Sequence, residues 1–362
     1  MLQAIAPRQV LRGPAAWHHA LPLLPALLQR PLVLGRSAAT AELRAGLHNE
    51  LAAAGLQPTA AQLRFDCCEE DLAALQAIAG EQRLDGVIAI GGGKVLDSGK
   101  LLADRLDLPC VTVPTSAATC AGWTALANIY SPEGAYRHDV ALRRCPELLV
   151  FDHGLVRQAP APTLASGIAD AMAKWYEASV ASGSSGDGLV QQAVQMARVL
   201  RDQLLLDAAA ALADPASDAW VRVAEGCALS AGVIGGIGGA RCRTVAAHAV
   251  HNGLTQLPAA HARLHGEKVG FGILVQLRLE ELQTGSGLAG QARRQLVPLF
   301  RQLGLPVGLA DLGLAEASLR ELELVARFAC RPGSDLHQLP FAVSVPELLA
   351  ALVSTTAELQ PT

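Results

Sequence analysis

Three consecutive glycines lie between a buried apolar run and a helical pattern, and this junction constrains the fold of the first half of the chain. The apolar run spans residues 87–90, the glycines are 91–93, and apolar residues recur at helical spacing from Val95 to Leu106. Further apolar runs occur at 31–35, 63–65, 110–113 and 148–151, with a second helical pattern at 71–82. Strands that alternate with helices predict a parallel sheet with crossover helices.

The pattern changes after Pro160. Before it, the runs 126–130 and 136–142 flank Ser131–Gly134, which predicts a hairpin. After it, helices are predicted at 163–182, 188–212, 218–233, 245–256, 266–283, 288–303, 318–330 and 346–359. We therefore expect an α/β domain over residues 1–158 and an all-helical domain over residues 159–362, with a ligand in the cleft between them.

The overall composition argues against nucleic acid as a partner. The 362 residues carry a net charge of −4, and no basic run stands out, so an electrostatic footprint for nucleic acid is missing. Hydrophobic residues make up 51% of the chain and charged residues 17%, which is typical of a folded globular protein with room for two cores.

The N-terminal apolar stretch Ala20–Leu28 follows Arg8 and Arg12 and so loosely resembles a signal peptide. Pro22 and Pro25 interrupt it, and no small-residue cleavage site follows directly. We interpret the stretch as a short buried helix.

Two further features bear on the location of the protein. The glycine-rich apolar run Gly226–Ala240 is expected to be too short to span a bilayer, so no membrane partner is predicted. The eight cysteines show no C-x-x-C spacing, and a chain of this size without an export signal should keep them as thiols in a reducing cytoplasm.

Lysine is rare in this chain. Of the 29 cationic residues only four are lysines: Lys94, Lys100, Lys174 and Lys268. Where arginine is the default cation, a remaining lysine can mark a place that a guanidinium does not fit, although chance on a solvated surface is the alternative.

The glycine junction has the properties of a phosphate-binding loop. Gly91, Gly92 and Gly93 allow backbone N–H groups to approach a pyrophosphate, and the following helix contributes the partial positive charge of its N-terminus. Lys94 can add a full charge, and Asp97, one turn into the helix, can hydrogen-bond a ribose or an amide. Three glycines alone would equally suit a tight strand–helix turn.

Three residues of the helical half predict a metal site. Asp170 is an acid in an apolar helical stretch, where a lone carboxylate is costly unless it is paired or bound to a metal. Together with His248 and His265 it offers a ligand set that suits zinc or iron and leaves a position open for substrate oxygen. Each histidine alone would favour an ordinary, satisfied core or surface residue, and the three residues indicate a metal site only together, through their surrounding motifs.

Six motifs along the chain resemble one family. They are the glycine loop, PTSAAT at 114–119, GIADA at 167–171, AHAVHNG at 247–253, HGEKV at 265–269 and LHQLPF at 336–341. In this order they are similar to the glycerol dehydrogenase branch of the iron-containing (group III) alcohol dehydrogenase superfamily. The resemblance implies a dehydroquinate synthase-like fold with an α/β N-terminal dinucleotide-binding domain and an all-helical C-terminal metal-binding domain.

The resemblance also implies an activity and its residues. The activity is metal-dependent hydride transfer between NAD(P)(H) and a small alcohol or polyol, or its aldehyde or ketone. Catalysis and metal binding would rest on Asp170, His248 and His265, with Lys174 nearby, and the substrate would meet Cys120, Trp123 and His251. The implied cofactor contacts are Gly91, Gly92, Gly93, Lys94, Asp97, Thr115, Ser116, Thr119, Thr124, Leu126 and Tyr130. The resemblance further implies a homo-oligomer.

The cofactor loop departs from the family pattern at Arg36. NAD-preferring relatives tend to carry an acid directly after the opening strand, where it binds the adenosine ribose. Arg36, followed by Ser37, would instead attract a 2′-phosphate. We therefore expect NADP to be accepted or preferred over NAD, with a solvent-facing arginine as the alternative.

The substrate side departs at Cys120, which stands where the family has a glycerol-binding acid. A thiol does not accept two hydrogen bonds from a polyol as a carboxylate does, and Trp123 adds bulk nearby. Glycerol is therefore a doubtful substrate, and a less polar alcohol, aldehyde or ketone is expected, unless water or another group replaces the carboxylate.

The metal side departs at Lys174, which stands where many iron-dependent relatives place a fourth ligand. Asp170 and Lys174 are four residues apart and share a helix face. An ammonium does not bind a metal, so we expect three protein ligands and zinc rather than iron. Lys174 would pair with Asp170 or meet an acidic group of the substrate.

Three alternatives stay open. A dehydroquinate synthase-like lyase would need more basic residues than the helical half offers. A glycerol-1-phosphate dehydrogenase-like enzyme would use the pair Arg241 and Arg243. A non-catalytic cofactor-binding protein would tolerate the changes at Cys120 and Lys174, but buried metal ligands without a metal would destabilise it.

Overall fold

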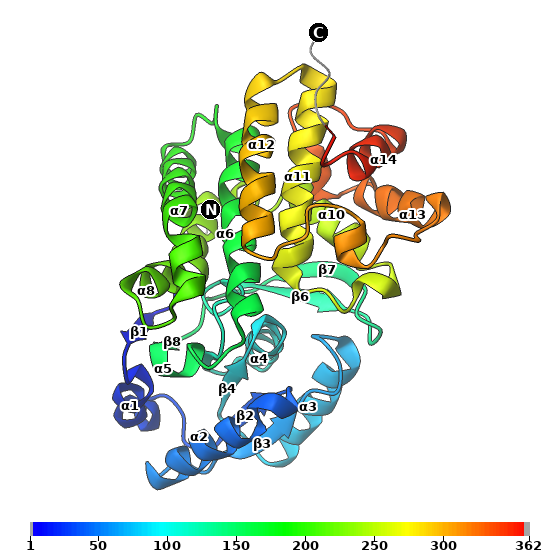
Figure 1. The fold of residues 1–362 in the computed structure, drawn as a ribbon. Coiled ribbons are helices and arrows are strands. Elements are labelled where there is room, and N and C mark those ends of the chain that lie inside the picture. The colour runs from blue at the N-terminus through cyan, green and yellow to red at the C-terminus, as the bar shows by residue number, and fades with distance from the viewer. Residues whose placement is uncertain (1–2, 358–362) are drawn as a thin grey trace. The chain divides into compact units, whose positions relative to one another are not determined.

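The computed structural model describes residues 3–357 and divides into two compact units, with the boundary between Pro160 and Ala161. The sequence analysis placed that boundary at residue 158. In the first unit, six parallel strands form one sheet in the order β1-β8-β5-β4-β2-β3 (Figure 1). These strands are β1 (Gln9–Gly13), β2 (Pro31–Gly35), β3 (Thr59–Gln62), β4 (Gly86–Gly91), β5 (Cys110–Pro114) and β8 (Leu148–Asp152).

Both faces of this sheet are buried, as in other all-parallel sheets. The covering helices are α1 (Ala16–Ala20), α2 (Ala41–Ala53), α3 (Glu69–Glu81), α4 (Gly93–Leu106) and α5 (His153–Val156), with the 3₁₀ turn η1 (Leu21–Ala26). Leu32 and Leu34 of β2 pack in the cluster that holds the apolar side of α3 and α4. Val33, which points to the other face, packs with α1, η1 and α2.

The strand predicted at 63–65 is wrong, because the structure has β3 at Thr59–Gln62. The carboxylate of Asp71 accepts the N–H groups of Arg64 and Phe65 at 2.8 and 2.9 Å. These two amides therefore bind a side chain instead of a neighbouring strand.

Several elements of the first unit, among them β1, α2 and α5, were not predicted, and one stretch was predicted in the wrong form. Strand β1 and helix α2 carry too few regularly spaced apolar residues to stand out. The stretch 20–28 was expected to be a helix, but it forms the end of α1 and a 3₁₀ turn, because Pro22 and Pro25 lack the N–H groups of an α-helix. Leu24 and Leu28 are buried, as expected.

The predicted hairpin is present. Strand β6 (Leu126–Tyr130) pairs antiparallel with β7 (Tyr136–Ala141), and the rings of Tyr130 and Tyr136 meet edge to face. The N–H of Tyr130 also binds the carbonyl of Cys67, at 2.8 Å. This contact ties the hairpin to the loop that precedes α3.

The regular elements of the second unit are all helices among its described residues, as predicted. Its helices are α6 (Ala161–Ser182), α7 (Gly188–Ala213), α8 (Asp218–Glu225), α9 (Ala231–Gly238), α10 (Ala246–Leu254), α11 (His265–Thr284), α12 (Gly287–Gln302), α13 (Leu319–Ala329) and α14 (Val345–Val353). Helix α6 packs against α7 and α11, and α12 packs against α11 (Figure 1). The last predicted helix, 346–359, ends in the structure at Val353, and its residues 358 and 359 lie outside the described part of the chain.

The expectation that Gly226–Ala240 is too short for a membrane span was based on the wrong boundaries. Helices α8 and α9 are joined by a π-helical turn, Gly226–Ser230, so that one helical stretch runs over the 21 residues Asp218–Gly238. By length and composition alone this stretch could cross a bilayer. The most apolar part of this stretch is 61% buried within the protein, as is typical of a core helix in a helical domain.

Candidate metal and cofactor sites

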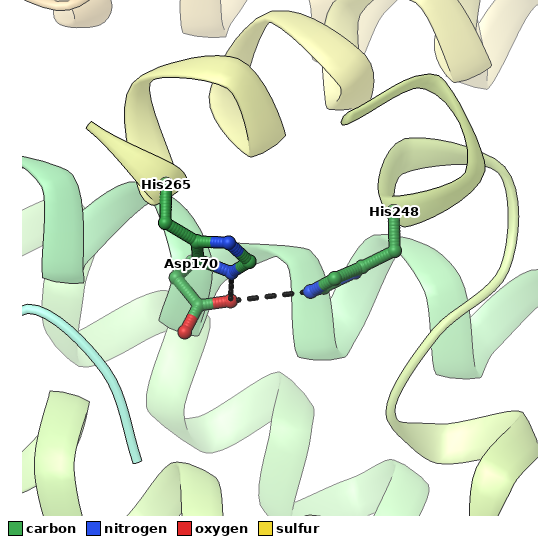
Figure 2. Close-up of side chains that lie close together, drawn as sticks. All are labelled: Asp170, His248 and His265. Atoms are coloured by element: carbon green, nitrogen blue, oxygen red, sulfur yellow. Dashed lines mark ion pairs between the residues drawn. The ribbon is translucent and has the colours of Figure 1, made fainter. Parts of the chain in front are cut away.

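Asp170, His248 and His265 come together in the second unit, on three different helices. Asp170 lies in the middle of α6, His248 in α10, and His265 is the first residue of α11. Their ligand atoms all lie within 4.8 Å of one another. Figure 2 shows both imidazoles directed at the same oxygen of Asp170, with Nε2–Oδ1 distances of 3.3 Å for His248 and 3.6 Å for His265.

Glycines set the close approach of these helices. A Cβ atom on Gly266 would lie 1.8 Å from the carbonyl oxygen of Ser166, one turn before Asp170 on α6. A Cβ atom on Gly272 would lie 2.3 Å from the carbonyl oxygen of Ala247, next to His248 on α10. Helix α11 can therefore contact both ligand-bearing helices only because these positions have no side chain.

The donor set fits a metal ion. Among the described residues, Oδ1 of Asp170 is a buried oxygen without a hydrogen bond, although two imidazole nitrogens face it. Two ligand atoms held about 2.0–2.1 Å from a tetrahedral ion lie about 3.3 Å apart, close to the two separations observed. A buried, unsatisfied carboxylate oxygen between two imidazoles is the arrangement that a bound cation would satisfy.

Glu177 orients His248 from behind. Its Oε2 lies 2.6 Å from Nδ1 of His248, and its Oε1 accepts the backbone N–H groups of Val245 and His248 at 2.7 and 3.0 Å. Burial and the Lys174 ammonium lower the pKa of His248, but the carboxylates of Glu177 and Asp170 together outweigh them and raise that pKa to about 9. Once the Nε2 proton of His248 is lost, the hydrogen bond to Glu177 keeps the other proton on Nδ1, so that the Nε2 lone pair faces Asp170 and suits a metal.

The sequence analysis missed Glu177. It lies seven residues after Asp170 and is fully buried on the same face of α6. A second acid at this spacing in an otherwise apolar helix was the signal that could have found it.

A chain of three side chains fixes the orientation of His265. Its Nδ1 lies 3.0 Å from Nε2 of His251, whose Nδ1 lies 2.9 Å from the side-chain oxygen of Asn252. An amide oxygen only accepts, so His251 donates through Nδ1 and receives the Nδ1 proton of His265 on its Nε2. The Nε2 of His265 thus keeps its lone pair toward Asp170.

Burial accounts for most of the electrostatic change at these two rings. It lowers the pKa of His265, and together with the nearby charges of His265 and Lys268 it lowers the pKa of His251 well below its usual value. His251 was expected to meet the substrate. The structure places its ring against that of His265, with centroids 4.3 Å apart.

Lys174 lies beside the metal ligands. Its Nζ is 3.7 Å from Oδ1 of Asp170 and donates a hydrogen bond to the carbonyl of Arg243 at 3.2 Å. Burial alone would raise the pKa of Asp170, but the Lys174 ammonium and the two imidazoles hold it well below its usual value. Asp170 is therefore ionised at neutral pH, as a metal ligand must be.

In the first unit, the predicted phosphate loop lies against the segment that follows β5. The N–H of Thr115 binds the carbonyl of Gly91 at 3.1 Å. A Cβ atom on Gly92 would lie 3.9 Å from Oγ of Ser116, and one on Gly93 would lie 2.7 Å from Cγ2 of Thr119. The residues expected to bind the cofactor thus gather at the N-terminus of α4, where backbone N–H groups have no partner within the helix.

Lys100 connects three other predicted cofactor residues. Its buried ammonium lies 3.0 Å from Oδ1 of Asp97 and donates to the carbonyls of Thr124 and Leu126 at 3.0 and 2.5 Å. The second oxygen of Asp97 accepts the N–H of Asn128 at 3.1 Å. Lys100 was singled out only as one of the rare lysines, and the structure shows that it joins the hairpin to α4.

Arg36 and Lys94 share one anion. Nη1 of Arg36 lies 2.9 Å from Oδ1 of Asp66, and the ammonium of Lys94 hydrogen-bonds Oδ2 of the same carboxylate. Lys94 also lies 5.4 Å from the ring centroid of Tyr130, which brings this predicted cofactor residue to the same place. The sequence analysis missed Asp66, although it is an acid that closely follows a strand, as ribose-binding acids do.

The predicted substrate residues of the first unit differ in exposure. Trp123 is 9% exposed, and its Nε1 donates to the carbonyl of Ile5 at 3.1 Å. Cys120 is partly exposed, and its carbonyl accepts the N–H of Trp123 at 2.9 Å. The Trp123 indole therefore serves the packing of the N-terminal segment, which leaves Cys120 as the more accessible of the two.

Comparison with known proteins agrees with this geometry. The family model described as iron-containing alcohol dehydrogenase matches residues 7–153. An uncharacterized oxidoreductase of Synechocystis sp. is 58% identical, over 82% of this chain and 77% of that protein. The hydroxycarboxylate dehydrogenase A of Escherichia coli is 37% identical, over 80% of this chain and 79% of that protein. The chain belongs to the iron-containing alcohol dehydrogenase family.

A solved structure places the chain within this family. The structure of a probable glycerol dehydrogenase from Sinorhizobium meliloti covers 99% of each chain with a TM-score of 0.85 and 29% identity. The predicted glycerol dehydrogenase branch and the predicted fold class are therefore confirmed. As a member of the iron-containing alcohol dehydrogenase family, the chain is an oxidoreductase that uses a nicotinamide cofactor and a metal, and neither the lyase nor the non-catalytic alternative is favoured.

Proposed function

We propose that the chain transfers a hydride between NAD(P)(H) and a small alcohol or its carbonyl form, at a metal ion held by Asp170, His248 and His265. The observation that carries this proposal is the buried Oδ1 of Asp170, which lacks a hydrogen bond among the described residues and faces two imidazoles at 3.3 and 3.6 Å. When bound, such an ion lowers the pKa of a substrate hydroxyl, and the nicotinamide accepts the hydride.

The residues around the ligands prepare the site for that chemistry. Glu177 keeps the proton of His248 on Nδ1, and His251 receives the Nδ1 proton of His265, so both Nε2 atoms are kept for the metal. Lys174 stabilises the ionised form of Asp170. We propose Asp170, His248 and His265 as the metal-binding and catalytic residues, with Lys174 as a positioning residue.

We propose zinc as the metal and NADP as the favoured cofactor. Three protein ligands of this kind leave one position of a tetrahedral zinc ion open, and Lys174 occupies the place of a fourth ligand. Arg36 and Lys94 put two cations at the end of the strands that would hold the adenosine. We propose that residues 1–158 form the nucleotide-binding domain and residues 159–362 the metal- and substrate-binding domain.

The substrate is proposed to be less polar than glycerol, because Cys120 offers a thiol where a polyol needs a carboxylate. A second candidate is a 2-hydroxy acid, favoured by the ammonium of Lys174 close to Asp170 and by the 37% identity to a hydroxycarboxylate dehydrogenase. A cation beside the metal ligands would attract the carboxylate of such a substrate. We further propose a cytoplasmic homo-oligomer.

The test is oxidation of NADH and NADPH by the zinc-loaded protein with a panel of carbonyls. The panel contains dihydroxyacetone, aliphatic and aromatic aldehydes, 2-oxo acids and dihydroxyacetone phosphate, and the Asp170→Asn variant is the control for metal-dependent turnover. Turnover of aldehydes with NADPH supports the main proposal, and turnover of 2-oxo acids that falls more than aldehyde turnover in Lys174→Met supports the second. Efficient use of dihydroxyacetone with NADH would contradict the arguments from Arg36 and Cys120.

A further inference from the structure

Three charged residues meet where three neighbouring strands of the first unit end. Strands β4, β2 and β3 are adjacent in the sheet and parallel. Arg36 directly follows β2, Asp66 lies in the loop after β3, and Lys94 lies in the first turn of α4 after β4. The carboxyl ends of parallel strands are where open α/β sheets bind nucleotides.

The carboxylate in this group of three residues is buried, whereas the two cationic side chains are partly exposed. The side chain of Asp66 is 6% exposed, whereas those of Arg36 and Lys94 are 40% and 45% exposed. A buried carboxylate is costly without partners, so Asp66 draws both cations toward itself. The two cations would otherwise repel each other and extend into solvent.

The two cations are held differently. Lys94 donates a hydrogen bond to Oδ2 of Asp66. Arg36 lies 2.9 Å from Oδ1, but within residues 3–357 that oxygen receives no aligned hydrogen bond. The contact with Arg36 therefore rests on charge and lacks the paired hydrogen bonds that make arginine–carboxylate contacts strong. Of the two, Arg36 is the cation that is more easily released.

The backbone around Arg36 is fixed while its side chain is exposed. Its carbonyl accepts a hydrogen bond from Nε2 of Gln62 at 3.0 Å. Next to it, the carbonyl of Ser37 accepts from Nη1 of Arg44 at 2.7 Å. A change of partner at Arg36 thus needs only a rotation of its side chain.

We propose that Asp66 determines how strongly the enzyme selects the 2′-phosphate form of its cofactor, by competing with that phosphate for Arg36. This inference rests on the proposed nucleotide site. A 2′-phosphate carries close to two negative charges and must draw Arg36 away from Asp66, whereas a 2′-hydroxyl leaves the ion pair intact. Asp66 thereby lowers NADP affinity more than NAD affinity, so that both cofactors are accepted.

The test is the ratio of the NADH to the NADPH dissociation constant, measured by cofactor fluorescence on the metal-loaded full-length protein. Asp66→Asn removes the competing charge and keeps the shape of the side chain. We expect this ratio to rise at least about fivefold, which corresponds to ~1 kcal/mol for a half-exposed ion pair. Asp66→Asn also removes a partner of Lys94. Any resulting change that alters the affinity for both cofactors equally cancels in the ratio. The exposed Glu81→Gln is the matched control and should leave the ratio unchanged.

Two further variants separate the failure of this inference from the failure of the proposed function. In Arg36→Gln the ratio should fall, and adding Asp66→Asn to it should have no further effect. An unchanged ratio in Arg36→Gln would contradict the proposed role of Arg36 itself. A normal response of Arg36→Gln with no rise, or a fall, in Asp66→Asn would overturn the competition by Asp66 alone.

A crystal structure of the unaltered protein tests the same idea even where Asp66→Asn does not fold. With NADP bound, the Arg36 guanidinium should contact the 2′-phosphate and lie beyond ion-pair distance from Asp66. With NAD bound, the ion pair should persist. An Arg36–Asp66 ion pair that survives NADP binding would refute the proposal.

Discussion

Replacing Glu177 by glutamine should change how steeply metal affinity depends on pH more than it changes the affinity at any single pH. In the metal-free protein Glu177, together with Asp170, raises the pKa of His248 from its ordinary 6.5 to about 9. Below that pH a proton competes with the metal for His248, so affinity rises with pH. Between pH 6.5 and 8.5 the native affinity should increase roughly 80-fold from this one group, because each pH unit below the pKa corresponds to about a tenfold change.

In Glu177→Gln the pKa of His248 should fall toward its ordinary value. The metal affinity of the variant should then rise only about twofold between pH 6.5 and 8.5. The variant also loses the orientation of His248, which costs about 10- to 100-fold in metal affinity. The two effects oppose each other. At pH 6.5 the variant should bind zinc as tightly as the native protein or more tightly, and at pH 8.5 it should bind roughly 2- to 20-fold more weakly.

The assay is competition for zinc with a chromophoric chelator of known pH dependence, at half-unit steps from pH 6.5 to 8.5. Proton release on zinc binding, measured in weakly buffered solution, gives an independent value, which should be close to one proton at pH 7 for the native protein and smaller for the variant. The surface variant Glu323→Gln on α13 is the control. Parallel affinity curves for the native protein and Glu177→Gln would refute the role of Glu177 described above.

Three shorter predictions concern packing, the nucleotide unit and the metal. Gly272→Ala should lower the free energy of unfolding by ~1–3 kcal/mol in urea, because its Cβ would lie 2.3 Å from the carbonyl of Ala247, whereas Gly287→Ala, with open space around it, should not. Lys100→Met leaves the buried Asp97 without its cation and should cost ~3–5 kcal/mol in the same assay, with weaker NADH binding. Removal of the metal with a chelator should lower the melting temperature. Zinc added back at about 100 times its dissociation constant should raise the free energy of unfolding by ~2.7 kcal/mol. An unchanged melting temperature would argue against a metal in the native site.

The regular elements could be predicted from the sequence because their apolar residues recur at the spacing of one structure. The strands β2, β4, β5 and β8 are continuous apolar runs, as expected for a sheet buried on both faces. The elements that were missed or misplaced depend on partners far away in sequence. Strand β1 is defined by pairing with β8, and the end of β3 is set by the side chain of Asp71.

The candidate site, like the fold, could be predicted from the sequence only in part. Asp170, His248 and His265 could be proposed as a set from the motifs around them, and the structure brings their side chains together. Glu177 and Asp66 left signals in the sequence, but their roles could not be predicted, because an acid acts as an orienting or competing group only through the atoms that it touches. The rarity of lysine was informative: Lys100, Lys174 and Lys268 are buried, and carbonyl oxygens accept from each ammonium. A compact ammonium with three donors suits such places better than a planar guanidinium.

The pairing of β1 with β8 has a consequence for how the chain folds during synthesis. Every residue from Gln9 to Gly13 is matched with one from Leu148 to Asp152, so strand β1 has to wait for a partner that is made 139 residues later (148 − 9). At about 5–20 residues per second, the ribosome needs roughly 7–28 s to supply it. Near the end of that interval, once β5 has been made and before β8 follows, β5 has an open edge where β8 belongs, and such an edge can pair with another chain. The first unit therefore closes only after Asp152 has been made.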